Sequence, residues 1–160
     1  MILLIELIGL CAAFALVCFA GTGTDAKNLR SYASYPDEVQ DRIKATAEYR
    51  GRYREGSKAA AFLSNFLLFS IVLFVLGLFI RERDLVHNFL YLSILGQGLN
   101  LFDLLVIDHL WWRNTKRTRL TKIPDAELYK SPKKHVEAFI RAFVMYLLIA
   151  LLDGYLLTLF

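Results

Sequence analysis

Four long apolar runs alternate with segments that carry nearly all of the charge. The runs cover residues 2–20, 59–80, 88–107 and 136–157. Each run is about long enough to cross a hydrocarbon core of ~30 Å as a helix. The pattern predicts an all-α fold, an integral membrane four-helix bundle in which residues 1–160 form a single transmembrane domain.

Composition and charge strengthen this prediction and give it an orientation. With 56% hydrophobic residues and a mean hydropathy of +0.43, the chain is too apolar for an ordinary soluble domain. Lys and Arg number eight in segment 21–58 and eight in 113–134, but only two in the turn 81–87. By the positive-inside rule, we expect both long loops in the cytoplasm and both termini outside.

The first loop contains a pattern typical of a short amphipathic helix. From Pro36 to about Arg54, apolar residues recur at roughly helical spacing among many charges; they are Val39, Ile43, Ala47 and Tyr53. We expect this helix on the cytoplasmic surface, with its arginines near anionic lipid headgroups. The positive-inside rule is enough to explain the basic cluster 49-YRGRYREG-56, so no nucleic-acid partner is expected.

The third span has one polar face. At about 100° per residue, Gly96, Gln97, Asn100, Asp103 and Asp108 fall within an arc of roughly 140° around Ser93. Gln97 and Asn100 lie near the middle of the span, where polar groups must be satisfied by other helices or by water in a cavity. The face is therefore a buried interface, a wetted cavity, or both.

Two further spans carry candidate members of this intramembrane polar site. The amide of Asn65 in the second span needs a partner on another helix, so we expect it to face the bundle. Arg141 in the fourth span is the obvious cation for Asp103, although Glu137 precedes it by four residues and competes for it. The site is either a structural network or an ion or substrate site.

Other polar residues mark the two ends of the spans. Asp108 and His109 precede Trp111 and Trp112, whose rings favour the headgroup level, so we expect all four at the inner interface. Toward the outer side, Glu6 and Asp153 form a secondary acidic pair, which either comes together or stays separate near the helix ends.

No recognised catalytic motif accompanies these residues. The chain has no Walker loop, HExxH, Gly-x-Ser-x-Gly or paired Cys motif, and we expect no cofactor and no metal site. Three functions remain open. The first is a small transporter or channel-like protein, possibly a homo-oligomer. The second is an accessory or regulatory subunit of a larger membrane complex. The third is a membrane enzyme acting on lipid headgroups through Asp108, His109 and His135.

The segments 103-DLLVIDHLWWRNTKR-117 and 132-PKKHVEAFIRAF-143 resemble a group of small bacterial integral membrane proteins. These proteins have an Asp-x4-Asp-x2-Trp segment before a basic loop and a further span. The resemblance covers about the last half of the chain. It implies a bacterial cytoplasmic (inner) membrane and brings no activity with it.

Overall fold

The computed structural model describes residues 1–160 as helices, turns and one isolated bridge, with no strand. Four helical segments are long and apolar enough to cross a membrane; they are Ile2–Ala20, Lys58–Gly77, Leu85–Trp112 and Glu127–Leu157. This confirms the four predicted helices. The chain groups into two compact units. We call residues 1–12, 57–102 and 139–160 the span unit, and residues 13–56 and 103–138 the loop unit.

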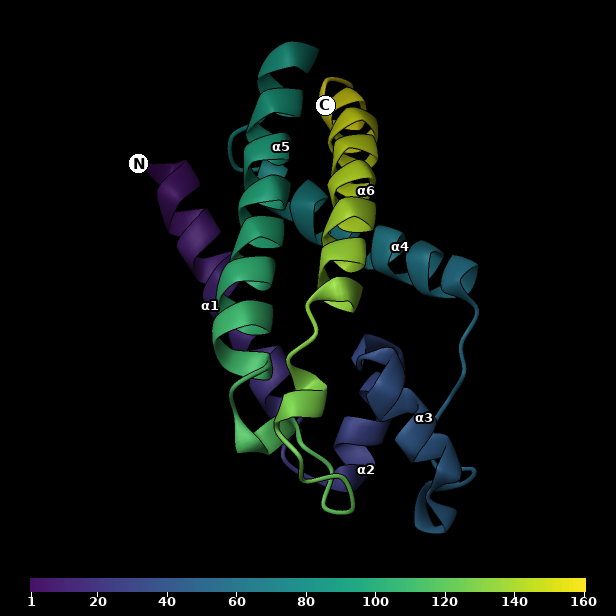
Figure 1. Ribbon diagram of the computed structural model, residues 1–160. Helices are drawn as coiled ribbons and strands as arrows, with labels where there is room; N and C mark the ends of the chain where they lie inside the picture. Colours follow the sequence, from purple (N-terminus) through teal and green to yellow (C-terminus); the bar gives the residue numbers. More distant parts are fainter. The chain divides into compact units, whose positions relative to one another are not determined.

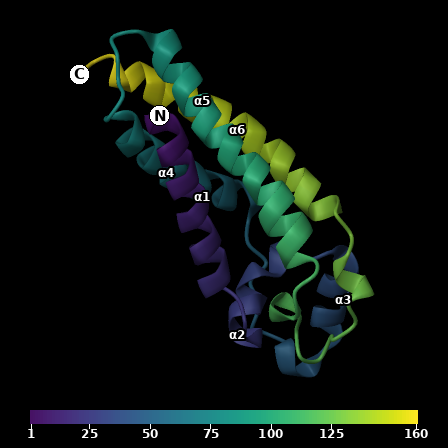
Figure 2. The same ribbon diagram turned by 90° about the vertical axis from the view of Figure 1, so that its left-hand side faces the viewer.

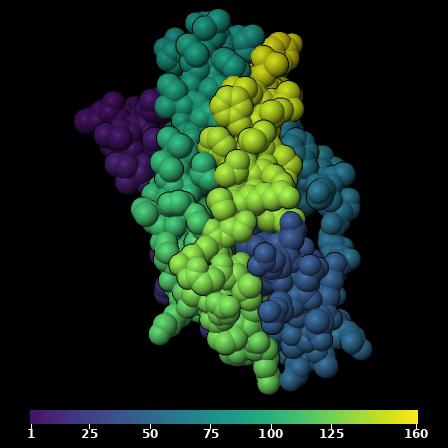
Figure 3. All heavy atoms as spheres, viewed as in Figure 1, coloured from purple at the N-terminus to yellow at the C-terminus, as the bar shows by residue number.

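The span unit contains the start of α1 (Ile2–Ala20), α4 (Lys58–Gly77), α5 (Leu85–Phe102) and most of α6 (Lys133–Leu157). Helices α5 and α6 run side by side in both ribbon views and touch along their length (Figures 1, 2 and 3). Glycines permit this approach: a Cβ on Gly96 would lie 2.8 Å from the Tyr146 ring, and one on Gly154 would lie 3.1 Å from the Phe89 backbone nitrogen. Close contact through small residues is typical of helices that pack in lipid.

The outer surfaces of α1 and α4 are apolar and largely uncovered. α1 buries no residue, and α4 buries only Leu73 and Gly77. Many of their large apolar side chains, such as Leu16 and Ile71, are more than half exposed. Such surfaces suit contact with lipid, where helices satisfy their own backbone polar groups.

A short turn joins α4 to α5, as the sequence predicts. The buried side chain of Asn88 holds it, because its Oδ1 accepts from Glu82 N at 3.0 Å and its Nδ2 donates to Glu82 O at 2.8 Å. The two chain ends lie at the same end of the span unit (Figure 2).

The loop unit forms where the two charged segments fold together. It contains α2 (Asp25–Asn28), η1 (Leu29–Ser34), α3 (Asp37–Ala45), η2 (Ala47–Tyr49), the π-helix η3 (Asp103–Trp112), η4 (Lys116–Thr118) and η5 (Glu127–Tyr129). In Figure 3 the second charged segment, in green, packs against the first, in blue. Their shared core consists of Leu29, Tyr32, Tyr35, Val39, Ile43, Tyr49, Trp112, Leu120, Ile123 and Tyr129.

The expected amphipathic helix is shorter than predicted and faces the protein. Its acids lie in the first turn and its cations in the last, as the helix dipole favours, but α3 ends at Ala45. Thr46 leaves the helical conformation, and the chain then turns so that Tyr49 enters the core. Val39 and Ile43 are fully buried in the loop unit. The apolar side of the predicted amphipathic helix is therefore covered by protein at these two positions.

Polar contacts join the two halves of the loop unit. The hydroxyl of Tyr35 donates to Thr118 O at 2.6 Å, and Asn28 Nδ2 donates to Arg117 O at 3.0 Å. The carboxylate of Asp25 accepts from Tyr49 Oη at 2.6 Å and from Thr121 N at 3.0 Å. Burial raises the pKa of Asp25, but the hydrogen bonds from Thr121 and Tyr49 outweigh burial and lower the pKa overall.

Arg117 caps the C-terminal end of α1 within the loop unit. Its guanidinium donates to Phe19 O at 3.1 Å and to Thr22 O at 3.1 Å, and it stacks 3.8 Å from the centroid of the Phe19 ring. The chain turns beneath it at Gly23, whose φ is +105° and which has no room for a side chain. These contacts satisfy carbonyl groups that have no partner within the helix.

Candidate functional site

The predicted polar face of the third span meets the fourth span. Gln97 Nε2 donates to Phe143 O at 2.9 Å, and Asn100 Nδ2 donates to Phe139 O at 3.2 Å. Asn100 is buried, and the hydroxyl oxygen of Ser93 is shielded from solvent without a hydrogen-bond partner. Here the face is a buried interface, in which amide groups bind backbone carbonyls of α6.

The structure does not bring Asn65 and Arg141 to this interface. Both residues are exposed on their helices, and neither forms a hydrogen bond or an ion pair. The predicted ion pair of Arg141 with Glu137 or Asp103 stays a prediction, because Arg141 lies in the span unit and both acids lie in the loop unit. Within the span unit, Asn65 does not face the other helices, because the only buried residues of α4 are Leu73 and Gly77.

Glu6 and Asp153, the two acids predicted toward the outer side, have separate partners. Glu6 Oε2 accepts from Tyr91 Oη at 3.0 Å, and Asp153 Oδ1 accepts from Ser70 Oγ at 2.7 Å. Each contact links two helices of the span unit, α1 to α5 and α4 to α6. Each acid therefore joins a different pair of helices.

A π-helix changes the geometry at the end of the third span. Residues 103–112 are π-helical, and Arg113 N donates to Asp108 O, five residues earlier, at 3.3 Å. In a helix closed by such hydrogen bonds, residues five apart lie about one turn apart. Asp103 and Asp108 are therefore closer in direction than α-helical spacing predicts. The α-helical angle predicted for Asp108 is wrong for this reason.

Asp108 reaches the first turn of α6. Its Oδ1 lies 2.9 Å from Nδ1 of His135, and the two side chains are 14% and 6% exposed. A carboxylate that accepts from Nδ1 fixes the proton there and leaves a lone pair on Nε2 of a neutral imidazole. A buried histidine held in this way can accept and release a proton at Nε2.

The surroundings of His135 contain few other polar groups. Its Nε2 is shielded from solvent and has no hydrogen-bond partner, and the same is true of Trp112 Nε1. The rings of Trp112 and His135 meet edge to face, with centroids 6.4 Å apart. The arrangement is a low-polarity site in which one carboxyl group contacts one imidazole.

The other predicted interfacial residues have further contacts of their own. His109 is exposed, and its Nδ1 lies 2.7 Å from Nη1 of Arg113. The ring of Trp112 is only 7% exposed and belongs to the loop-unit core, so protein rather than lipid headgroups covers it. Trp111 is half-buried and packs 6.4 Å from the Phe19 ring.

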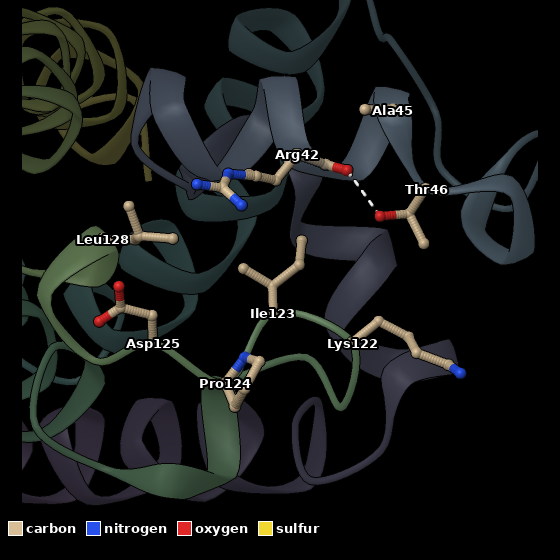
Figure 4. Close-up of a pocket in the computed structure, with 8 residues that line it drawn as sticks. All are labelled: Arg42, Ala45, Thr46, Lys122, Ile123, Pro124, Asp125 and Leu128. Atoms are coloured by element: carbon tan, nitrogen blue, oxygen red, sulfur yellow. Dashed lines mark hydrogen bonds between the residues drawn. The ribbon is translucent and has the colours of Figure 1, made fainter.

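The loop unit also has a shallow hollow of about 280 Å³ (Figure 4). The guanidinium of Arg42 and the amine of Lys122 point in different directions there, and Lys122 pairs with Glu48 at 3.3 Å. The hydroxyl of Thr46 donates to Arg42 O at 2.7 Å. The polar groups around this hollow are thus partly used by the chain itself and do not converge on one point.

The sequence grouped Asp108 and His135, together with His109, only under the enzyme hypothesis, and it did not predict their direct contact. The two residues lie 27 positions apart, and their contact depends on how the second charged segment folds back. One signal was present: the charged segments contain Tyr32, Tyr35, Tyr49 and Tyr129, more aromatic residues than a solvated loop needs. Comparison with protein families, with curated proteins and with solved structures found no match.

Proposed function

We propose that this protein is a small multi-pass transport protein of the bacterial cytoplasmic membrane that exchanges protons through Asp103, Asp108 and His135. The observation that carries the proposal is the buried contact of 2.9 Å between Asp108 and His135. Carboxyl and imidazole groups that follow one another along a path are typical of proton relays in membrane proteins. Asp103 supplies the next acceptor along η3.

The hydrogen bonds of the polar face support this choice of residues. The amides of Gln97 and Asn100 already bind backbone carbonyls of α6, so their contribution is to hold two helices together. Asp103, in contrast, has no hydrogen-bond partner, and Nε2 of His135 also has none. These two groups are free to bind a proton without breaking an existing contact.

Charge distribution supports the orientation that belongs to this proposal. The two loops rich in Lys and Arg face the cytoplasm and lie near anionic lipids, and both termini face outward. An even number of crossings agrees with chain ends at the same end of the span unit (Figure 2). The proton site then lies near the cytoplasmic end of the third and fourth spans.

Proton flux into liposomes tests the proposal. The purified protein is reconstituted around a pH-sensitive dye, and a pH gradient is imposed. We expect flux above that of empty liposomes, reduced at least about tenfold in His135→Gln, which keeps a polar side chain but cannot take up the proton. His109→Gln is the matched control, because it changes the same residue type on the neighbouring exposed site. Wild-type flux equal to that of empty liposomes would overturn the proposal.

Acid–base catalysis on a lipid headgroup is a second candidate, favoured by the same contact. Asp108 and His135 form the pair that such an enzyme needs. His109, the third predicted member, contacts Arg113 instead. Lipid analysis of the same liposomes separates the two functions: headgroup conversion that depends on His135, without proton flux, would favour the enzyme.

A further inference from the structure

Asp153 is the only fully buried acid in the chain. It lies in the last two turns of α6, and 1% of its surface is exposed. Its Oδ1 lies 2.7 Å from Ser70 Oγ of α4, whereas its Oδ2 is shielded from solvent and has no hydrogen-bond partner. Both residues belong to the span unit. Acids held inside a membrane span are costly, and they mark sites that bind protons, ions or substrates.

No cation compensates a charge on Asp153. It forms no ion pair, and the exposed Arg81 and Arg83 of the nearby turn do not contact it. The helices packed around it offer few other titratable groups; they are Lys58 at the start of α4, His87 and Tyr91 of α5, which contact Glu82 and Glu6, and Tyr146, two turns earlier on the same face of α6. A carboxylate here would keep part of its negative charge on Oδ2 without a donor, which is strongly unfavourable in a buried position.

The hydroxyl of Ser70 suits both protonation states of Asp153. It donates to Oδ1 when the side chain is a carboxylate. When Oδ1 carries a proton, the acid donates to Ser70 Oγ, and the serine hydroxyl turns to a backbone carbonyl of its own helix. Oδ2 is then a carbonyl oxygen without a full charge, so its lack of a partner costs less. The geometry therefore favours the protonated acid and allows its release.

We infer that Asp153 and Ser70 form a second proton-binding site, in which Asp153 is held as a neutral acid and exchanges its proton with water. The proton forms an O–H bond to Oδ1, and it comes from water and returns to water. A route for water is short, because Asn88 Nδ2 donates to Gly154 O at 3.4 Å and so brings the polar α4–α5 turn beside Asp153. In the proposed orientation this turn faces outside. The site's part in transport rests on the proposed function, whereas its proton binding does not.

Infrared spectroscopy of the full chain in liposomes at neutral pH tests this inference. The wild-type spectrum minus that of Asp153→Asn is expected to contain the carbonyl band of a protonated carboxylic acid. Transfer to heavy water should shift this band, because the proton exchanges. Ser70→Ala should move it to higher frequency, because the acid loses its hydrogen-bond acceptor. Asp84→Asn is the matched control: Asp84 is exposed in the α4–α5 turn, so its difference spectrum should contain the bands of an ionised carboxylate.

A difference spectrum of Asp153→Asn with only the bands of an ionised carboxylate would overturn the inference. A protonated band that stays in place in Ser70→Ala, or that does not shift in heavy water, would also overturn it. Circular dichroism shows whether each variant remains helical. If Asp153→Asn does not fold, the heavy-water shift of the wild type compared with that of Ser70→Ala decides the question.

Proton flux tests the part of this site in transport separately. Asp153→Asn is expected to lower flux at least about tenfold, because an amide cannot take up the proton. Unchanged flux in this variant would remove Asp153 from the transport path. A wild type without flux would overturn the proposed function, and the infrared result would still decide whether Asp153 binds a proton.

Discussion

The span unit and the loop unit are built in opposite ways. The span unit has an apolar outer surface, and its inner contacts include amide groups bound to carbonyls and glycines packed against rings. The loop unit has charged groups outside and a core of tyrosines and aliphatic residues. Burial of apolar area drives the loop unit together in water. In lipid that driving force is absent between helices, so close packing and hydrogen bonds replace it.

The loop unit should therefore respond most strongly to loss of a core ring. Tyr35 is fully buried, and Tyr35→Ala is expected to lower the free energy of unfolding of the loop unit by about 3–5 kcal/mol. Denaturation followed by tryptophan fluorescence measures this directly, because Trp111 and Trp112 both lie in the loop unit. Tyr155→Ala, at a residue that is 55% exposed in the span unit, is the control. Equal unfolding midpoints for the two variants would contradict the comparison.

The span unit should respond to added volume at its helix contact. In Gly96→Ala the new methyl group meets the base of the Tyr146 side chain at 2.8–3.0 Å, so a loss of about 1–3 kcal/mol is expected. In Gly98→Ala the nearest atoms are methyl groups of Leu7, which can rotate away at little cost. Thermal loss of the helical circular dichroism signal in detergent compares the two. A larger effect at Gly98 would show that α5 and α6 do not depend on this contact.

Acid should weaken the loop unit through Asp25. The pKa of Asp25 is lower in the folded chain than its ordinary value of 3.8, so its contribution is present above that value and is lost as pH falls through the folded pKa. Asp25→Asn should cost about 1–2 kcal/mol at neutral pH, because the donors from Thr121 and Tyr49 lose a charged acceptor. The variant should also lose part of the acid dependence. Unfolding midpoints from pH 7 to pH 3 in both proteins measure this, and parallel curves would contradict the assignment.

The smallest effect is expected at the polar face of α5. Gln97→Leu removes one hydrogen bond to Phe143 O, and bonds of this kind between helices in lipid average about 0.6 kcal/mol. Thermal unfolding of the span unit should therefore change little, and proton flux should stay close to that of the wild type. A loss of proton flux with unchanged folding would mean that Gln97 belongs to the transport site.

The sequence was sufficient for the spans and for one interface. Length and hydropathy predicted the four helices, because only long apolar helices satisfy their backbone in lipid. The helical spacing of Gln97 and Asn100 also placed both on one face, and the structure directs both to carbonyls of α6. Within α5 the spacing is α-helical, so the angles apply.

The sequence was insufficient where the chain folds on itself over long distances. Asn28 and Arg117 are 89 residues apart in the chain, and no local pattern predicts their contact. The apolar stripe of α3 indicated a surface to be covered, but not whether lipid or protein covers it. The π-helix was also not predicted. Residues 103–112 have no periodicity that distinguishes hydrogen bonds between residues five apart from hydrogen bonds between residues four apart.

The most direct test of the proposed site compares proton flux in Asp108→Asn, His135→Gln and the double variant in liposomes. If the two side chains act as one proton-exchanging unit, each single variant lowers flux at least about tenfold, and the double variant lowers it no further than the more severe single one. Losses that multiply in the double variant would mean that the two residues act independently. Wild-type flux no greater than that of empty liposomes would contradict the account altogether.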